Sequence, residues 1–124
     1  MASKEELYDD GMAEFAMGEF DGAVAKFKEA LAADVKYFDA WHALSETYFR
    51  KGDYDAAIEA GKKSLELNPG DQLAHTSLSR FYVKKGMIKE AEYHAAQSRI
   101  GSWKEQLSKP KPTDKPTDKP LDKA

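Results

Sequence analysis

Residues 38–71 read FDAWHALSETYFRKGDYDAAIEAGKKSLELNPGD, and they predict one complete helical hairpin. Trp41, Leu44 and Tyr48 are spaced three and four residues apart, which places them on one side of a helix. Gly52 can adopt the left-handed conformation that ends this helix. The hairpin carries apolar residues on too many sides to bury them by itself, so it needs neighbours of the same kind.

The second helix of this hairpin has start and stop signals of its own. Asp55 is predicted to cap its N-terminus, because a carboxylate there accepts backbone N–H groups and favours the positive end of the helix dipole. Small residues such as Gly61 occupy its packing stripe, where two helix backbones must approach each other. Pro69 and Gly70 are predicted to end it, because this pair favours a turn.

The same pattern recurs on both sides of the hairpin at a spacing of thirty-four residues. Gly18 and Gly86 stand at the place of Gly52 and mark two further turns. His75 occupies the core position that Trp41 holds in the middle repeat. The chain therefore contains three copies of one supersecondary unit, each able to cover the exposed face of the next.

The signature W-x2-L-G-x2-Y, followed by A-x3-F and P, is typical of the tetratricopeptide repeat, and this chain resembles that family. The middle repeat matches the signature at Trp41, Leu44, Tyr48, Ala57 and Pro69. Gly61 departs from it, because repeat one has the aromatic Phe27 at that place. The resemblance implies an all-α fold, a right-handed α-solenoid of three antiparallel helix hairpins. We expect one domain over residues 4–108, with repeats at about 4–37, 38–71 and 72–105.

The last predicted helix starts near Ile88 and continues to about Ser108. Arg99 stands where the earlier repeats have leucine, which suits the polar outer face of a terminal repeat. Trp103 stands where the template has proline. We expect Trp103 to fold back as a lid over the end of the stack; the alternative is an exposed contact for a partner or a second copy.

Residues 109–124 repeat a four-residue pattern of lysine, proline and aspartate. Proline at every fourth position forbids a helix, and almost no apolar surface is present to offset the entropy of ordering. We predict an extended, disordered, solubilising tail. A ligand for a polyproline-reading module is the alternative.

Composition and charge exclude several classes of protein. The chain has no cysteine and a net charge of −3, and we read no secretory signal or membrane-spanning run from it, so we expect a cytoplasmic protein without membrane contact. Residues 4–37 contain nine acidic and four basic side chains, whereas residues 72–105 contain three acidic and six basic ones. A domain-wide basic surface for nucleic acid is missing. Opposite ends could associate head to tail.

No motif for catalysis or metal binding is apparent. His42, His75 and His94 share no i, i+4 spacing and have no matching carboxylate pair. No HExxH, phosphate-binding glycine loop or nucleophile elbow occurs. We therefore expect no enzymatic activity, no cofactor and no metal.

The resemblance also implies a concave groove, lined by the first helix of each hairpin, that receives a peptide or a helix. By template position the groove-lining residues are Tyr8, Met12, Phe15, His42, Glu46, Phe49, Arg50, Thr76, Arg80, Val83 and Lys84. Phe15 and Phe49 could instead pack against the adjacent repeat, and Arg80 and Lys84 could simply be solvated.

We therefore predict a non-enzymatic scaffold for protein–protein interaction, with a protein or peptide partner bound in this groove. The alternative is a structural protein that self-associates through its acidic and basic ends. We expect a monomer or a weak homo-oligomer.

Overall fold

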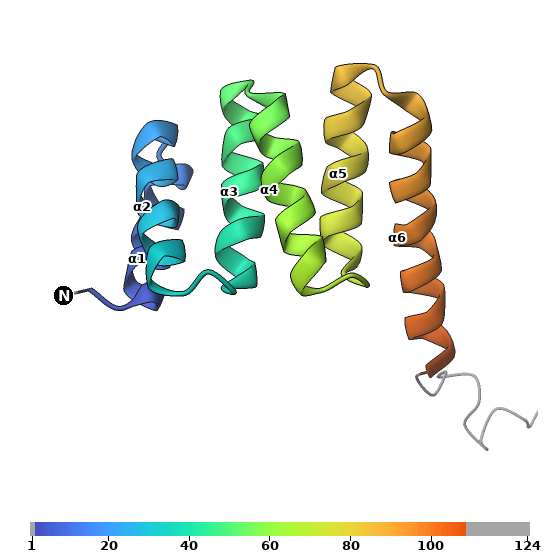
Figure 1. Ribbon diagram of the computed structural model, residues 1–124, viewed down its shortest axis with the longest axis horizontal. Helices are drawn as coiled ribbons and strands as arrows, with labels where there is room; N and C mark the ends of the chain where they lie inside the picture. The colour runs from blue at the N-terminus through green and yellow to red at the C-terminus, as the bar shows by residue number, and fades with distance from the viewer. Residues whose placement is uncertain (1, 109–124) are drawn as a thin grey trace, which may run out of the picture.

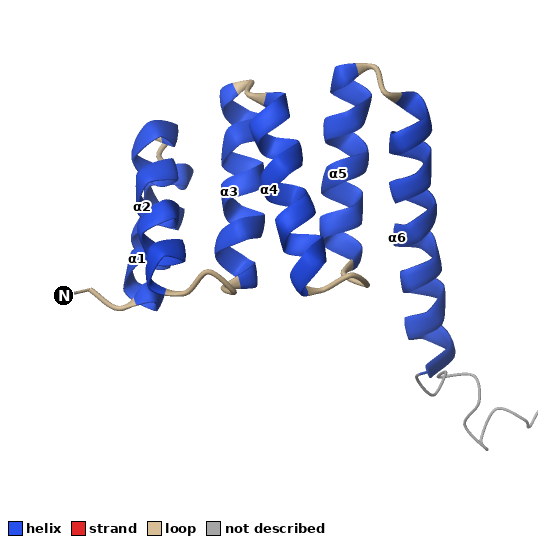
Figure 2. Ribbon diagram, viewed as in Figure 1, coloured by secondary structure: helices blue, strands red, loops and turns tan. Residues whose placement is uncertain are grey.

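The computed structural model describes residues 2–108, which form three antiparallel helical hairpins stacked side by side (Figures 1 and 2). The helices are α1 (Lys4–Ala16), α2 (Phe20–Ala33), α3 (Phe38–Lys51), α4 (Tyr54–Leu67), α5 (Gln72–Lys85) and α6 (Ile88–Ser108). No strand occurs among the described residues. The predicted all-α solenoid is confirmed.

Glycine ends the first helix of each hairpin, as the sequence predicts. Gly52 follows α3 with φ +90°, and Gly18 and Gly86 have the same left-handed backbone. The predicted cap of α4 is wrong by two residues, because Asp53, not Asp55, accepts a hydrogen bond from the backbone N–H of Ala56 (3.3 Å). Because α4 already begins at Tyr54, Asp55 lies inside its first turn.

The core of the first two repeats forms around Phe27 of α2, which is fully buried in a cluster with residues of α1 and α3. Gly11 of α1 makes this possible, since a Cβ atom there would lie only 2.5 Å from the Phe27 ring. Tyr8 packs on the same ring, with centroids 5.8 Å apart.

A second core joins repeats two and three. Leu78 and Phe81 of α5 are fully buried against Ala57 and Ile58 of α4. A Cβ atom at Gly61 would lie 2.9 Å from the Leu78 side chain. Repeat two therefore departs from the signature at Gly61 because Leu78 of the next repeat occupies the space that an aromatic residue would need.

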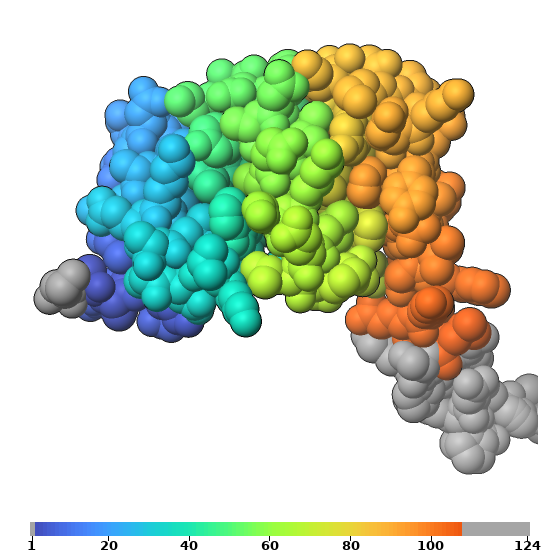
Figure 3. Space-filling model, viewed as in Figure 1, coloured from blue at the N-terminus to red at the C-terminus, as the bar shows by residue number. Residues whose placement is uncertain are grey.

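Helix α6 is longer than the others, with 21 residues against 13 or 14, and its end projects beyond the stack (Figures 1 and 3). The predicted continuation to Ser108 is confirmed. The predicted lid is wrong: Trp103 is 64% exposed. Because the helix continues without a break, Trp103 stays on the face turned away from α5. Arg99 is exposed, as expected.

The predicted tail, residues 109–124, lies outside the described residues. Within the described range, no helix has the length and apolar character required to cross a membrane.

Replacing Gly52 by alanine tests the left-handed turn. A Cβ atom at Gly52 would meet no other atom within 4 Å, so the expected loss of about 1–2 kcal/mol in the free energy of unfolding comes from backbone strain alone. Gly70→Ala is the matched control, since Gly70 is equally open and its φ lies outside the left-handed region. Urea unfolding measures both variants, and equal midpoints would contradict the assignment.

Candidate functional site

A hollow of about 350 Å³ lies between α1 and α3. Its lining residues are Tyr8, Met12 and Phe15 from α1 and His42, Ala43, Glu46 and Arg50 from α3. The α1 residues are spaced four and three apart, and the polar α3 residues four apart, so each set shares one helix face. We call this hollow the α1–α3 pocket. It brings together six of the predicted groove residues.

Tyr8 belongs to both the core and the pocket. Its ring packs against Phe27 and against Tyr37, with centroids 5.8 and 5.6 Å apart. Burial, followed by the nearby carboxylate of Asp39, raises the pKa of Tyr8 above its ordinary value. The hydroxyl therefore stays protonated at neutral pH and can donate a hydrogen bond to a ligand.

Arg50 places a positive charge at one end of the pocket. Its guanidinium lies over the rings of Phe15 and Phe20, 5.3 and 5.7 Å from their centroids. Among the described residues no carboxylate forms an ion pair with Arg50. The aromatic rings hold the side chain in place while its charge stays available to an anion.

Arg80 is already paired. Its guanidinium donates to the Glu46 carboxylate (2.7 Å), to which the Ser77 hydroxyl also donates. It also lies over the Phe49 ring, 5.2 Å from the centroid. Phe49 in turn stacks on the buried Phe81, with centroids 4.9 Å apart. Phe49 is therefore a packing residue between repeats two and three, the alternative that the sequence left open, and the pocket does not include it.

The other predicted groove residues also lie outside the pocket. The Thr76 hydroxyl is 2.8 Å from the Ser98 hydroxyl of α6, so it joins two helices. Val83 and Lys84 are exposed near the C-terminal end of α5. All of them lie on α5, whereas the lining of the α1–α3 pocket comes from α1 and α3.

His42 contributes an unusual polar group to the pocket wall. Its Nδ1 atom is buried and finds no hydrogen-bond partner among the described residues. The ring stacks on Phe38, with centroids 6.2 Å apart. If the neutral His42 ring carries its proton on Nε2, the buried Nδ1 atom has a lone pair and no N–H group that needs an acceptor. Nε2 is then the donor that a ligand could use.

Sequence reasoning missed a second hollow of about 500 Å³, on the side of α2 and α4. It is lined by Lys28, Leu31, Trp41, Leu44, Tyr48, Ala56, Glu59, Ala60 and Lys63. Trp41 and Tyr48 were expected in the core, and both are partly buried. The sequence signal for this hollow was the pair Ala56 and Ala60, because their small side chains leave space beside Trp41 and Tyr48. Its charged groups come from the long side chains of Lys28, Glu59 and Lys63.

Two family models of the tetratricopeptide repeat match the chain, one over residues 8–72 and one over residues 48–97. The chain belongs to the tetratricopeptide repeat family. The three hairpins described above are its repeats.

Relatives of this tetratricopeptide array are mostly longer proteins. Human superkiller complex protein 3 is 35% identical over 74 residues, which are 60% of this chain and 5% of that protein. Photosystem I assembly protein Ycf3 of Synechococcus sp. (strain CC9605) is 28% identical over 104 residues, which are 82% of this chain and 59% of that protein. This chain therefore spans less than two thirds of either relative.

Solved structures agree on the fold. A crystal structure of MamA superposes with a TM-score of 0.83 at 30% identity, covering 85% of this chain and 61% of that one. The Yersinia enterocolitica type III secretion chaperone SycD, in complex with a peptide of the translocator YopD, superposes with a TM-score of 0.76. At 18% identity, with 84% of this chain and 83% of that chain covered, this second likeness concerns the fold alone.

A pair of histidines joins the last two helices of the tetratricopeptide array. His75 Nε2 lies 2.9 Å from the Pro69 carbonyl oxygen, which can only accept, so Nε2 carries a proton. When both rings are neutral, His75 Nδ1 has a lone pair, which accepts from His94 Nδ1 at 2.9 Å. No group of three or more possible metal ligands occurs among the described residues, so we read the pair as a structural hydrogen bond.

This pair predicts a stability that depends on pH. Burial is the main reason why the pKa of His94 lies below its ordinary value, and the charges of His75 and of Lys62 on α4 act in the same direction. The unfolded chain therefore binds this proton more tightly, so the folded state loses stability as pH falls from about 6.5 through the lowered pKa. His94→Gln keeps a polar group at the site and should reduce this loss.

Urea unfolding of the wild type and of His94→Gln at pH 7.5 and 5.5 measures the effect. This range lies above the ordinary pKa of the carboxylates, so histidines dominate the change. An identical fall in the unfolding midpoint of both proteins would show that His94 does not contribute.

Proposed function

We propose that this chain is a non-enzymatic interaction scaffold whose α1–α3 pocket binds a peptide segment of a partner protein. The observation that carries the proposal is the pocket itself, where apolar side chains of α1 face His42, Glu46 and Arg50 of α3 across one hollow. A mainly apolar hollow with a few convergent polar groups is the usual form of a binding site.

The pocket suggests the chemistry of the segment. Its volume of about 350 Å³ suits one or two side chains rather than a whole helix, and Tyr8, Met12 and Phe15 favour an apolar one. Arg50 has no carboxylate partner among the described residues, so an acidic residue of the partner should lie beside it. Arg80 is less suitable for this contact, because Glu46 already neutralises it.

The fold of the tetratricopeptide array supports a peptide as the ligand. The SycD structure named above contains a bound peptide, and the second tetratricopeptide domain of Spaghetti was solved with an HSP90 peptide. The excess of acidic side chains in repeat one opposes nucleic acid as the partner. We propose no cofactor.

Substitution of Met12 tests the apolar part of the site. Peptides are selected from a random phage-displayed library against the wild-type chain and then titrated against purified variants. Met12→Glu should weaken their binding by about tenfold or more, because it places a charge where an apolar anchor docks. Met12 is 38% exposed, so the variant should fold.

Met17→Glu is the matched control, since Met17 lies in the α1–α2 turn and is 71% exposed. Peptides that lose affinity equally for both variants would contradict binding in the α1–α3 pocket. Failure to select any peptide that distinguishes Met12→Glu from the wild type would do the same.

Substitution of Arg50 tests the charged part of the site. Arg50→Glu should slow association with the selected peptides by about tenfold and should reduce the dependence of the association rate on salt. The selected peptides should carry an Asp or Glu beside their apolar residue. Lys63→Glu makes the same charge change on α4, outside the pocket, and an equal effect in both variants would point to a non-specific effect of net charge.

A further inference from the structure

Helix α6 uses one face to pack on α5. The Ser79 hydroxyl donates to the Ala91 carbonyl (2.9 Å), and the Gln72 amide donates to the Glu105 carboxylate (2.8 Å). The residues of α6 on this inner face are small or polar, among them Ala91, Ser98 and Gly101. These contacts fix the rotation of α6 about its own axis and therefore determine which residues point away from the stack.

The opposite face of α6 is apolar. Its residues are Tyr93, Ala96, Ile100, Trp103 and Leu107, which we call the outer stripe. Their spacing of three, four, three and four residues is the spacing of the seam in a two-helix coiled coil. Tyr93, Ile100, Trp103 and Leu107 are 58%, 42%, 64% and 59% exposed. A terminal tetratricopeptide repeat with a solvated outer face has no need of such a stripe.

The outer stripe is apolar and also contains a hollow. A hollow of about 400 Å³, lined by Ala96, Arg99, Ile100 and Trp103, lies on this face. The small side chain of Ala96 leaves room between its larger neighbours. A large side chain from a facing helix could enter there, as knobs enter holes in a coiled coil.

We infer that the outer stripe pairs with the outer stripe of a second copy of this chain, with the two α6 helices antiparallel. A two-fold interface matches a surface with itself. The head-to-tail alternative pairs opposite charges but lacks an apolar counterpart. On the described part of repeat one, the exposed large apolar side chains are Met12, Met17 and Val35. They lie on three different segments, and Met12 belongs to the α1–α3 pocket.

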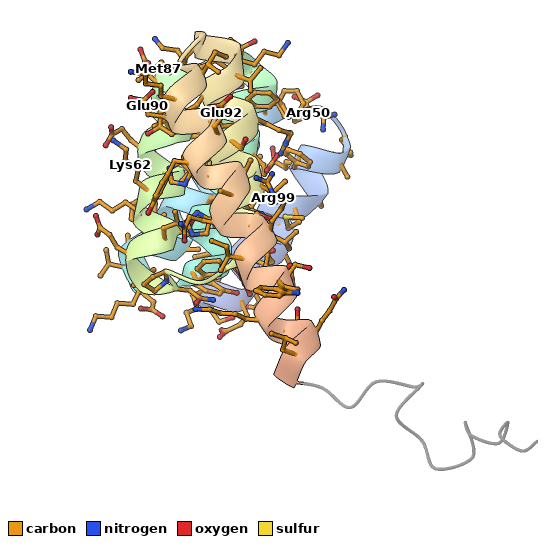
Figure 4. All side chains as sticks on the ribbon, turned by 90° about the vertical axis from the view of Figure 1, so that its right-hand side faces the viewer. Arg50, Lys62, Met87, Glu90, Glu92 and Arg99 are labelled. Atoms are coloured by element: carbon orange, nitrogen blue, oxygen red, sulfur yellow. The ribbon has the colours of Figure 1, made fainter. Side chains whose placement is uncertain are left out.

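Charges beside the stripe favour the antiparallel orientation. Glu90 and Glu92 lie towards the N-terminal end of α6, whereas Arg99 and Lys104 lie further along (Figure 4 labels the first three). None of these four forms an ion pair within the described residues. A parallel pair would place Arg99 beside the second copy's Lys104, which is repulsive. An antiparallel pair places Glu90 beside the second copy's Lys104, twice by symmetry.

The antiparallel register also matches the sizes of the side chains. In the antiparallel register whose two-fold axis passes near residue 98, Ala96 faces the second copy's Ile100 beside the hollow. Tyr93 meets the second copy's Trp103, an aromatic pair that adds to the burial of apolar surface. Arg99 lies close to its own counterpart near the two-fold axis, and this contact opposes pairing.

The interface is small. An aromatic side chain buries about 150–250 Å² in full. Four partly exposed side chains therefore present less than the about 800 Å² per partner of a standard interface. The dimer should consequently be weak and should dissociate on dilution. The stripe and the α1–α3 pocket lie on different helices, so this inference is independent of the proposed peptide site.

Sedimentation equilibrium of the full chain over a concentration series reaching millimolar tests the inference. The wild type should approach the mass of a dimer and no higher. Ile100→Glu should raise the dissociation constant by about tenfold or more, because it places a charge at the centre of the seam. Val35→Glu, at an exposed apolar residue in the α2–α3 connection, should have no effect.

Charge exchange tests the orientation. Glu90→Lys and Lys104→Glu should each weaken the dimer, and the double variant should restore it. Arg99→Gln should strengthen the dimer, because it removes the repulsion near the axis. A wild type that stays monomeric, species larger than a dimer, a dimer unaffected by Ile100→Glu, or a double variant without recovery would overturn the inference.

Discussion

The stack depends on a large buried side chain packing against a glycine at two places. Phe27 of α2 lies against Gly11 of α1, and Leu78 of α5 lies against Gly61 of α4. Both large side chains are fully buried, and a Cβ atom at either glycine would be closer to them than packed carbon atoms allow. The spacing between helices follows from these contacts. The positions of the surface side chains follow from that spacing.

The α1–α3 pocket is a consequence of this packing. Tyr8 and Phe15 each have one side in contact with other aromatic rings, and these contacts hold them in place without a ligand. Arg50 is held over Phe15 in the same way. A site whose side chains are already positioned loses little conformational entropy on binding. Much of the candidate site is therefore organised by residues whose main contribution is to stability.

Helix α6 differs from the other helices in having two contrasting faces. The inner face is small and polar and joins α5 through hydrogen bonds between side chains, including the histidine pair. The outer stripe is apolar, and its large side chains are 42–64% exposed. Peptide binding and self-association would therefore use opposite ends of the stack, and neither would block the other.

The sequence by itself determined the number of helices and the turns between them, because these depend on local signals. Gly52 and its counterparts end helices through their own backbone conformation, and the thirty-four-residue period follows from the order of residues. The error at the cap of α4 shows the limit of such signals. A cap is defined by where the helix begins, and Asp53 and Asp55, only two residues apart, both fit the sequence pattern.

Only the tertiary structure decided which groove residues share a pocket and which face of α6 is covered. Template position placed Phe49 and Arg80 in the groove. In the structure Phe49 stacks on Phe81 and Arg80 pairs with Glu46, and neither lines the α1–α3 pocket. Trp103 looked like a lid because it is apolar. It is exposed because the small residues on the opposite face of α6 allow closer approach to α5, and a rigid helix cannot bury both faces against one neighbour.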